Sequence, residues 1–120
     1  MVKNIIIIII FCLALIGAWI FALTVARADT TPPDGIILIN NNATTVYSRT
    51  VNVLIPAQDN YEIADMCVGV GACTWEPYAI SKQIQLTGTG NAWYSICERT
   101  RDRAGNESVM KCVAVQYIGN

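Results

Sequence analysis

The sequence predicts an all-β sandwich of roughly seven or eight strands, preceded by one transmembrane α-helix. Three observations support this prediction. An apolar run near the start carries no charge, and Gly, Asn, Asp and Pro divide the rest of the chain into short apolar or alternating segments. Four cysteines follow the apolar run. The chain therefore divides into a membrane anchor or signal peptide at 1–28, a Pro-rich linker at 29–35 and the β-sandwich at 36–120.

The apolar run extends from Ile5 to Ala26, with Lys3 before it and Arg27 after it. About 22 residues at about 1.5 Å each cover about 33 Å, which is enough to cross the hydrocarbon core of a bilayer. The positive-inside rule then places the domain on the periplasmic or extracellular side of the inner or plasma membrane. Ala26 and Ala28, on either side of Arg27, also fit the small-x-small pattern of signal-peptide cleavage before Asp29, and the length of the run favours an uncleaved anchor.

The first half of the sandwich begins after the linker Asp-Thr-Thr-Pro-Pro-Asp-Gly, whose two prolines keep it extended. We expect a strand at 36–39, a turn at the three asparagines that follow, and a short edge strand at 45–48. Residues 50–56 alternate in polarity, which places Val51, Val53 and Ile55 on one face of the next strand.

The second half contains three further segments before the last hairpin. Asp59 and Asn60 predict a turn, 63–68 a strand, 69–72 a reversal and 75–80 the return strand. Residues 82–87 alternate again, with Ile84 and Leu86 inward, and 88–91 forms a Gly-rich turn.

The stretch 93–117 reads as a β-hairpin around the turn residues 101–107. If the turn is centred between Ala104 and Gly105, Asp102 faces Glu107 and Thr100 faces Val109. The same register places Cys97 opposite Cys112. Directly opposed residues of an antiparallel pair have Cβ atoms about 4.5–5.5 Å apart, close to the separation that a disulfide requires.

Four extracytoplasmic cysteines permit three pairings. The hairpin register favours Cys97 with Cys112, which leaves Cys67 with Cys73 to close the reversal between two strands. A metal cluster is disfavoured because the sequence has no histidine and no Cys-x-x-Cys spacing. Cys12 lies inside the apolar run and is expected to be a buried thiol.

Composition excludes several classes of function. Beyond Arg27 the chain carries six basic and nine acidic residues, which is no footprint for nucleic acid. The absence of histidine removes the commonest general base and the commonest metal ligand. We therefore expect no enzymatic activity and no cofactor.

Two groups of side chains are candidates for interaction. Strand alternation places Arg99 and Arg101 on the face of Cys97, with Arg103 at the turn. They form either a cationic tip for an acidic partner or a solvated face neutralised by nearby acids. The interpretation as a solvated face is favoured, and the expected neutralising residues are Glu98, Asp102 and Glu107.

The aromatic residues give a second choice. They form either a binding platform or, as is commoner, part of the core and edges of the sandwich. The residues concerned are Trp75, Tyr78, Trp93 and Tyr94.

Asp59, Asp65 and Asp102 lie near expected strand ends, but no loop has the oxygen spacing of a known calcium motif, so we predict no metal site.

Several segments together resemble a known family. They are the linker at 29–33, the strand ending in Met66, the sequence Trp-Glu-Pro-Tyr at 75–78 and Asp-Arg-Ala-Gly-Asn at 102–106. They resemble bacterial immunoglobulin-like modules of extracellular surface proteins, which are similar to fibronectin type III domains. The resemblance implies a non-enzymatic spacer or adhesive unit. This chain departs from the family in joining a single module to a membrane segment and in having four cysteines.

Taken together, these features predict an accessory or structural subunit of a larger membrane complex, in contact with other subunits and with the bilayer through Ile5 to Ala26. One alternative is a secreted binding or adhesion module, released by cleavage before Asp29. Another is a pilin-like filament subunit, although the apolar run lacks the processing site and the glutamate typical of type IV pilins.

Overall fold

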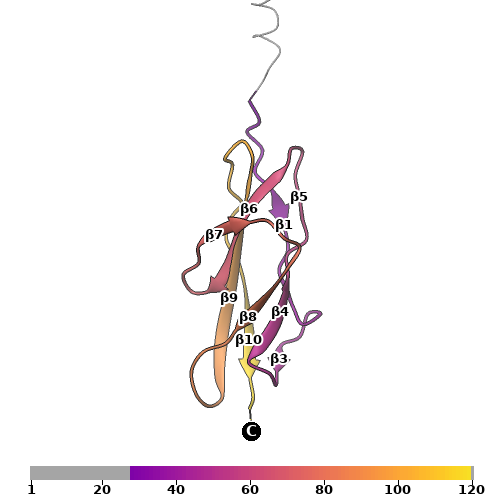
Figure 1. The fold of residues 1–120 in the computed structure, drawn as a ribbon. Coiled ribbons are helices and arrows are strands. Elements are labelled where there is room, and N and C mark those ends of the chain that lie inside the picture. Colours follow the sequence, from indigo (N-terminus) through magenta and orange to yellow (C-terminus); the bar gives the residue numbers. More distant parts are fainter. Residues whose placement is uncertain (1–27, 120) are drawn as a thin grey trace, which may run out of the picture.

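The computed structural model describes residues 28–119, which form an elongated all-β domain (Figure 1). The predicted transmembrane helix at Ile5 to Ala26 lies outside the described residues. Within 28–119, no helix has the length and apolarity needed to cross a membrane. The linker enters at one end of the domain, and the last strand finishes at the opposite end (Figure 1).

Two main sheets face each other and form a sandwich. The five-stranded sheet has the order β3-β10-β9-β6-β7, the three-stranded sheet has the order β2-β4-β8, and β1 and β5 form a separate pair. The strands are β1 (Asp34–Gly35), β2 (Leu38–Ile39), β3 (Thr45–Val46), β4 (Thr50–Leu54), β5 (Ala57–Gln58), β6 (Ile63–Val70), β7 (Trp75–Pro77), β8 (Ser81–Gln85), β9 (Ala92–Asp102) and β10 (Lys111–Tyr117).

The core lies between the two main sheets and follows the predicted alternation. Val51, Val53 and Ile55 are fully buried. Leu86 is also buried, and Ile84 is partly buried against the core. From the opposite sheet, Ile96 and Val115 contribute fully buried side chains, and Val46, Met66 and Val68 are also buried there. Ile39 on β2 adds a further fully buried side chain to the sheet of β4. Alternation therefore predicted the inner faces of β4 and of the segment that contains β8.

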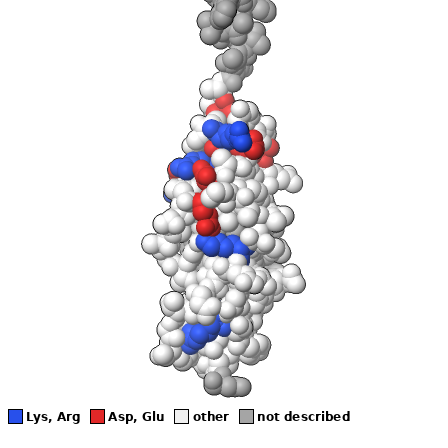
Figure 2. All heavy atoms as spheres, in the orientation of Figure 1, with Lys and Arg blue, Asp and Glu red and all other residues white. Residues whose placement is uncertain are grey.

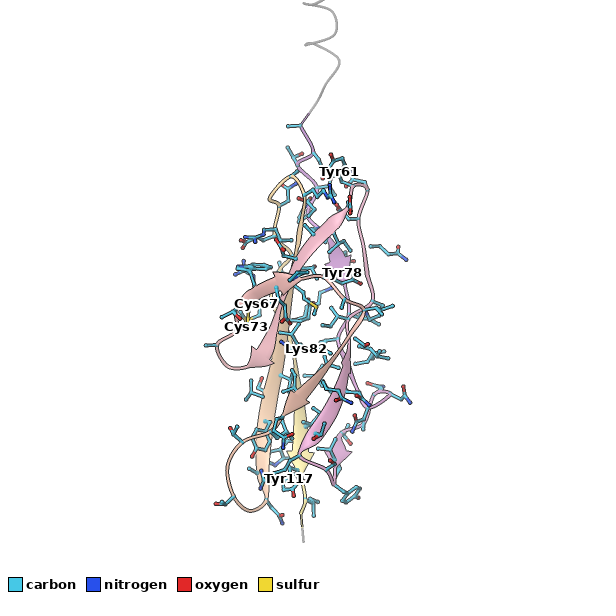
Figure 3. The ribbon with its side chains drawn as sticks, viewed as in Figure 1. Tyr61, Cys67, Cys73, Tyr78, Lys82 and Tyr117 are labelled. Atoms are coloured by element: carbon cyan, nitrogen blue, oxygen red, sulfur yellow. A yellow bond between two sulfur atoms is a disulfide. The ribbon has the colours of Figure 1, made fainter. Side chains whose placement is uncertain are left out.

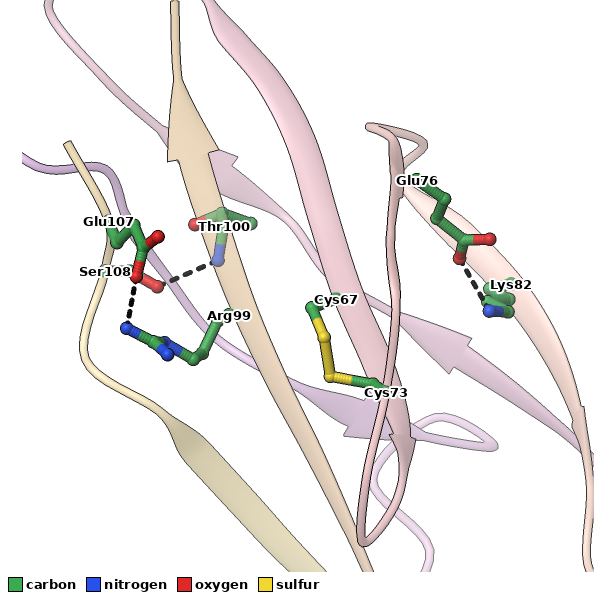
Figure 4. Close-up of a disulfide and its surroundings, with 8 residues drawn as sticks. All are labelled: Cys67, Cys73, Glu76, Lys82, Arg99, Thr100, Glu107 and Ser108. Atoms are coloured by element: carbon green, nitrogen blue, oxygen red, sulfur yellow. Dashed lines mark hydrogen bonds and ion pairs between the residues drawn. A yellow bond between two sulfur atoms is a disulfide. The ribbon is translucent and has the colours of Figure 1, made fainter. Parts of the chain in front are cut away.

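Polar contacts join the two sheets where the chain crosses from β7 to β8. Lys82 on β8 forms an ion pair with Glu76 on β7, with 2.6 Å between Nζ and Oε1 (Figure 4). The Tyr78 hydroxyl donates to the carbonyl of Ile55, at 2.8 Å, while the Tyr78 amide donates to the carbonyl of Ala64. These contacts fix the crossover by bonding it to both sheets.

The described part has ten strands where seven or eight were expected, and the difference lies mainly near the linker. The predicted strand at 36–39 is shortened to Leu38 and Ile39, which pair with β4, whereas Asp34 and Gly35 of the predicted linker form an extra strand that pairs with β5. The predicted turn at the three asparagines is present. Asn40, Asn41 and Asn42 have φ values of 44°, 58° and 70°, a left-handed conformation that asparagine tolerates better than most residues.

The hairpin register is right in the strands and wrong near the turn. Cys97 faces Cys112 across β9 and β10. Closer to the turn, however, Glu107 pairs with Arg101 instead of Asp102. Thr100 accepts from the amide of Ser108 and donates its own amide to the Ser108 hydroxyl, so it does not face Val109. The Ser108 hydroxyl replaces a backbone acceptor, and the ladder shifts by one residue as a result.

Candidate functional sites at the linker end and on the outer face

The outer face of β9 carries the predicted arginines. Arg99 and Arg101 are part-buried and alternate with residues that point into the sandwich. Arg99 pairs with Glu107 at 2.5 Å (Figure 4), and Arg101 pairs with Asp65 at 2.8 Å. These pairs make the face a neutralised surface and not a free cationic tip.

Arg103 lies at the turn and pairs with Glu62, with 2.8 Å between Nε and Oε2. Both side chains of this pair are 61% exposed, so solvent weakens the attraction strongly. Figure 2 shows the charged side chains gathered mainly in the half of the domain nearer the linker, with blue and red atoms intermixed. The arginine surface is therefore locally balanced by acids.

Two of the acids expected to neutralise these arginines lie elsewhere. Glu98 is 1% exposed and Asp102 is 2% exposed, so both point into the sandwich from β9. The prediction was wrong because strict alternation on β9 turns every even-numbered residue inward. Glu62 and Asp65, next to β6 and on it, take the expected positions instead.

The four candidate aromatic residues do not form one platform. Trp75 lies on the edge strand β7 beneath Arg101, whose guanidinium carbon is 4.3 Å from the centroid of the ring. Tyr78 and Tyr94 pack against the core, and the Tyr94 hydroxyl donates to the carbonyl of Thr87 at 2.6 Å. Trp93 is 65% exposed at the end away from the linker. Core and edge positions thus describe three of the four residues.

The structure brings both expected cysteine pairs to bonding distance. The Cα atoms of Cys97 and Cys112 are 4.0 Å apart, and those of Cys67 and Cys73 are 5.4 Å apart. Figure 3 shows the second pair at the turn between β6 and β7. Both disulfides therefore staple the five-stranded sheet.

A cluster of three carboxylates lies where the linker meets the domain. Oxygens of Asp29, Asp59 and Asp102 all lie within 4.8 Å of one another. Asn60 donates to Asp29 Oδ1 at 3.1 Å, and Asn106 donates through Nδ2 to the Asp29 carbonyl at 3.0 Å. The linker is thus attached to two loops of the domain.

The cluster leaves two oxygens without a partner among residues 28–119. Asp29 Oδ2 and Asp59 Oδ1 are buried atoms that accept no hydrogen bond from this part of the chain. Both oxygens of Asp102 accept from Asn106, one from the backbone amide and one from the side chain, each at 2.9 Å. Carboxylate oxygens are the ligands that Ca²⁺ prefers, so this donor set is suitable for a hard cation.

Asp102 remains a carboxylate in this setting. Burial alone would raise its pKa, but the hydrogen bonds from the side chain and backbone of Asn106 outweigh burial and hold the pKa below its ordinary value of 3.8. Sequence reasoning named Asp59 and Asp102 but grouped them with Asp65, which instead binds Arg101. It missed Asp29, for which the only local indication was that an acidic residue begins the linker.

Comparison with known proteins identifies the fold and no closer relationship. No family model matches the sequence, and no curated protein matches it. Among solved structures, the PKD1 domain of Vibrio anguillarum Epp superposes with a TM-score of 0.58 at 12% identity, covering 77% of this chain and 100% of that one. The fibronectin(III)-like modules of Clostridium thermocellum CbhA give 0.54 at 15% identity, covering 70% and 98%. The described residues therefore have the fold of an immunoglobulin-like, fibronectin III-type module.

Proposed function

We propose that this chain is a non-enzymatic, single-span membrane protein whose immunoglobulin-like domain lies outside the cytoplasm and serves as an accessory or structural subunit of a larger membrane complex. The charge-free run from Ile5 to Ala26 supports the membrane span. The fold of residues 28–119 supports a module that acts through contacts with other molecules.

The attachment of the linker carries this proposal. Asn106 donates to both the Asp29 carbonyl and the Asp102 carboxylate, and Asn60 donates to the Asp29 side chain. These bonds hold the chain that enters the domain against two separate loops. A fixed joint suits a module that must keep one orientation relative to the segment before it. A freely swinging tether would need no such bonds.

The buried acids, which are the most plausible catalytic residues, are either hydrogen-bonded within the domain or shielded from solvent. Asp102 accepts a hydrogen bond at each oxygen and is only 2% exposed, so it is poorly placed to take a proton from a substrate. Glu98 is 1% exposed and lies beneath the ladder. The positions of these acids favour a binding or structural role over a catalytic one.

The proposal is tested by purifying the full chain gently from its native membrane, and by measuring the intact mass and the proteins that accompany it. We expect a full-length mass, two disulfides and companions in fixed stoichiometry. A full-length chain that runs as a lone monomer would contradict the subunit role.

Two variants of the full chain test the joint itself. In Asn106→Ala the linker loses a bond to the domain, and we expect recovery of the companions to fall. Asn91→Ala is the matched control, because within residues 28–119 its side-chain oxygen accepts a hydrogen bond from the Gly119 amide alone, at the other end of the domain. Equal recovery with both variants would mean that orientation at the joint does not matter for assembly.

A secreted binding module is the second candidate function, and exposed aromatic residues favour it. Trp93 is 65% exposed and Tyr47 is 75% exposed, and both lie at the end away from the linker. Rigid aromatic side chains are common anchors of binding surfaces. A mature mass that begins at Asp29, without companions, would favour this candidate over the membrane subunit.

A further inference from the structure

We propose that the Cys97–Cys112 disulfide is a thiol-exchange site, at which an external thiol of the glutathione class becomes covalently attached to Cys112. The two residues are directly opposed on β9 and β10 and lie on the outer face of the five-stranded sheet. Cys112 is exposed and Cys97 is half-buried. The bond is therefore open to solvent in the folded domain.

Three neighbours of this disulfide on the same face are small, whereas Arg99, two residues after Cys97, is long and its guanidinium is bound to Glu107. Gly69 is the register partner of Cys97 on β6, and it presents no side chain. Ser95 precedes Cys97 by two residues on β9, and Ala114 follows Cys112 by two residues on β10. Because residues two apart on a strand share a face, no large side chain from these three positions covers the sulfur atoms.

The second disulfide differs at one of its two sulfur atoms, because Cys73 is half-buried like Cys97 whereas Cys67 is covered. Cys67 is paired in register with Trp75 on one side and with Arg99 on the other, and both side chains are large. The Arg99 guanidinium carbon is 6.0 Å from the centroid of the Trp75 ring, so the two groups approach each other across Cys67. Cys67 is accordingly only 6% exposed. Figure 4 shows this pair between β6 and the turn that follows it.

The chemical step conserves atoms and electrons. A thiolate attacks Sγ of Cys112, the bond to Cys97 breaks, and its electron pair remains on Cys97 as a thiolate that then takes a proton from water. One disulfide replaces another, so no net oxidation or reduction occurs. The Ser95 hydroxyl lies 3.8 Å from Cys97 Sγ and can donate to the departing thiolate.

The fold can survive this step. Seven register pairs join β9 and β10, from Lys111 with Glu98 to Tyr117 with Ala92. The strands thus stay paired through their backbone bonds and their inner faces after the bond opens. The site does not depend on the membrane role proposed above, because its geometry belongs to the described domain alone.

The test uses the folded, fully oxidised full chain incubated with reduced glutathione, quenched with N-ethylmaleimide and mapped by peptide mass spectrometry. We expect glutathione on Cys112 and N-ethylmaleimide on Cys97, with exchange about tenfold faster than at Cys67–Cys73. The proposal is overturned if Cys67–Cys73 opens first. It is equally overturned if both bonds open only in urea at the unfolding transition, or if glutathione attaches mainly to Cys97.

Two substitutions separate access from general stability. Ala114→Leu places a large side chain beside the bond and should slow exchange severalfold, whereas Ala114→Ser, the matched control, should leave the rate unchanged. Trp75→Ala uncovers the other disulfide and should raise the exchange rate at Cys67 without altering that at Cys112. Equal rates in both Ala114 variants would show that access does not govern the reaction. Near-ultraviolet circular dichroism verifies that each variant is folded.

Discussion

The guanidinium of Arg101 is held between a ring and a carboxylate. Its carbon lies 4.3 Å from the centroid of Trp75, and its Nη2 donates to Asp65 at 2.8 Å. The three residues come from β9, β7 and β6, so one side chain joins three adjacent strands. A planar guanidinium meets both partners at once, which an ammonium group cannot do.

Arg101→Lys should therefore lower the free energy of unfolding by about 1 kcal/mol, although the charge is unchanged, because stacking and the forked hydrogen bonds are lost. Urea denaturation of the folded domain measures the change. Arg103→Lys is the control, since its pair with Glu62 is 61% exposed and should contribute little. If the free energy of unfolding falls equally in the two variants, the shape of the Arg101 side chain contributes nothing to stability beyond its charge.

The left-handed turn before β3 gives a second prediction. Asn42 has a φ of 70°, where a side chain with a Cβ atom is strained and glycine is not. Asn42→Ala should lower the free energy of unfolding by about 1 kcal/mol, and Asn42→Gly should leave it unchanged or raise it slightly. Thermal and urea denaturation of both variants test this. A loss as large in the glycine variant would point to side-chain contacts of Asn42 instead of the backbone.

Sequence patterns predicted what repeats locally and missed what depends on distant partners. Alternation predicted the buried face of β4 and the outward position of Arg99 and Arg101. The same rule places Glu98 on the buried face, where it is 1% exposed, although its charge is typical of a surface residue. Asp29 was treated as part of the linker because its partners Asn60 and Asn106 are 31 and 77 residues away. No local pattern indicates contacts of that length.

The carboxylate cluster at the linker gives a third prediction. Among the described residues, Asp29 Oδ2 and Asp59 Oδ1 have no hydrogen-bond partner, and both carboxyl groups lie close to Asp102, so a bound cation would give these oxygens a partner. Millimolar Ca²⁺ should raise the melting temperature relative to EDTA, because binding to the folded state alone stabilises it. Asp59→Asn should remove the calcium-dependent part of the increase. Glu62→Gln, a nearby exposed acid outside the cluster, serves as the control. Identical melting curves in calcium and EDTA would rule out a cation at this position.

Asn106 gives a fourth prediction, which concerns pH. The folded-state pKa of Asp102 lies below its ordinary value of 3.8, so the carboxylate adds stability that is present above that value and is lost as pH falls through the folded pKa. Asn106→Ala removes the bond from Nδ2 and should reduce this contribution. The melting-temperature difference from the wild type should be largest near about pH 6 and shrink below about pH 3.8. A difference that stays constant across this range would assign the effect to the linker bond alone.

The buried Glu98 should have the opposite pH dependence. It is 1% exposed, and its Oε2 has no hydrogen-bond partner in the described domain, since the facing Lys111 binds Asp34 at 2.7 Å. Burial raises its pKa above the ordinary 4.5 despite the positive charge of Lys111, and Asp34 raises it further. The unfolded chain therefore releases this proton first, and stability falls as pH rises from the ordinary pKa to the folded one. Scanning calorimetry should show that Glu98→Gln melts at a higher temperature than the wild type at pH 7.5 and at the same temperature near pH 4. The control Glu107→Gln loses a surface ion pair, so its melting temperature should not rise at either pH. A glutamine variant that is less stable at pH 7.5 would mean that ionised Glu98 is held by Lys111 in the native domain.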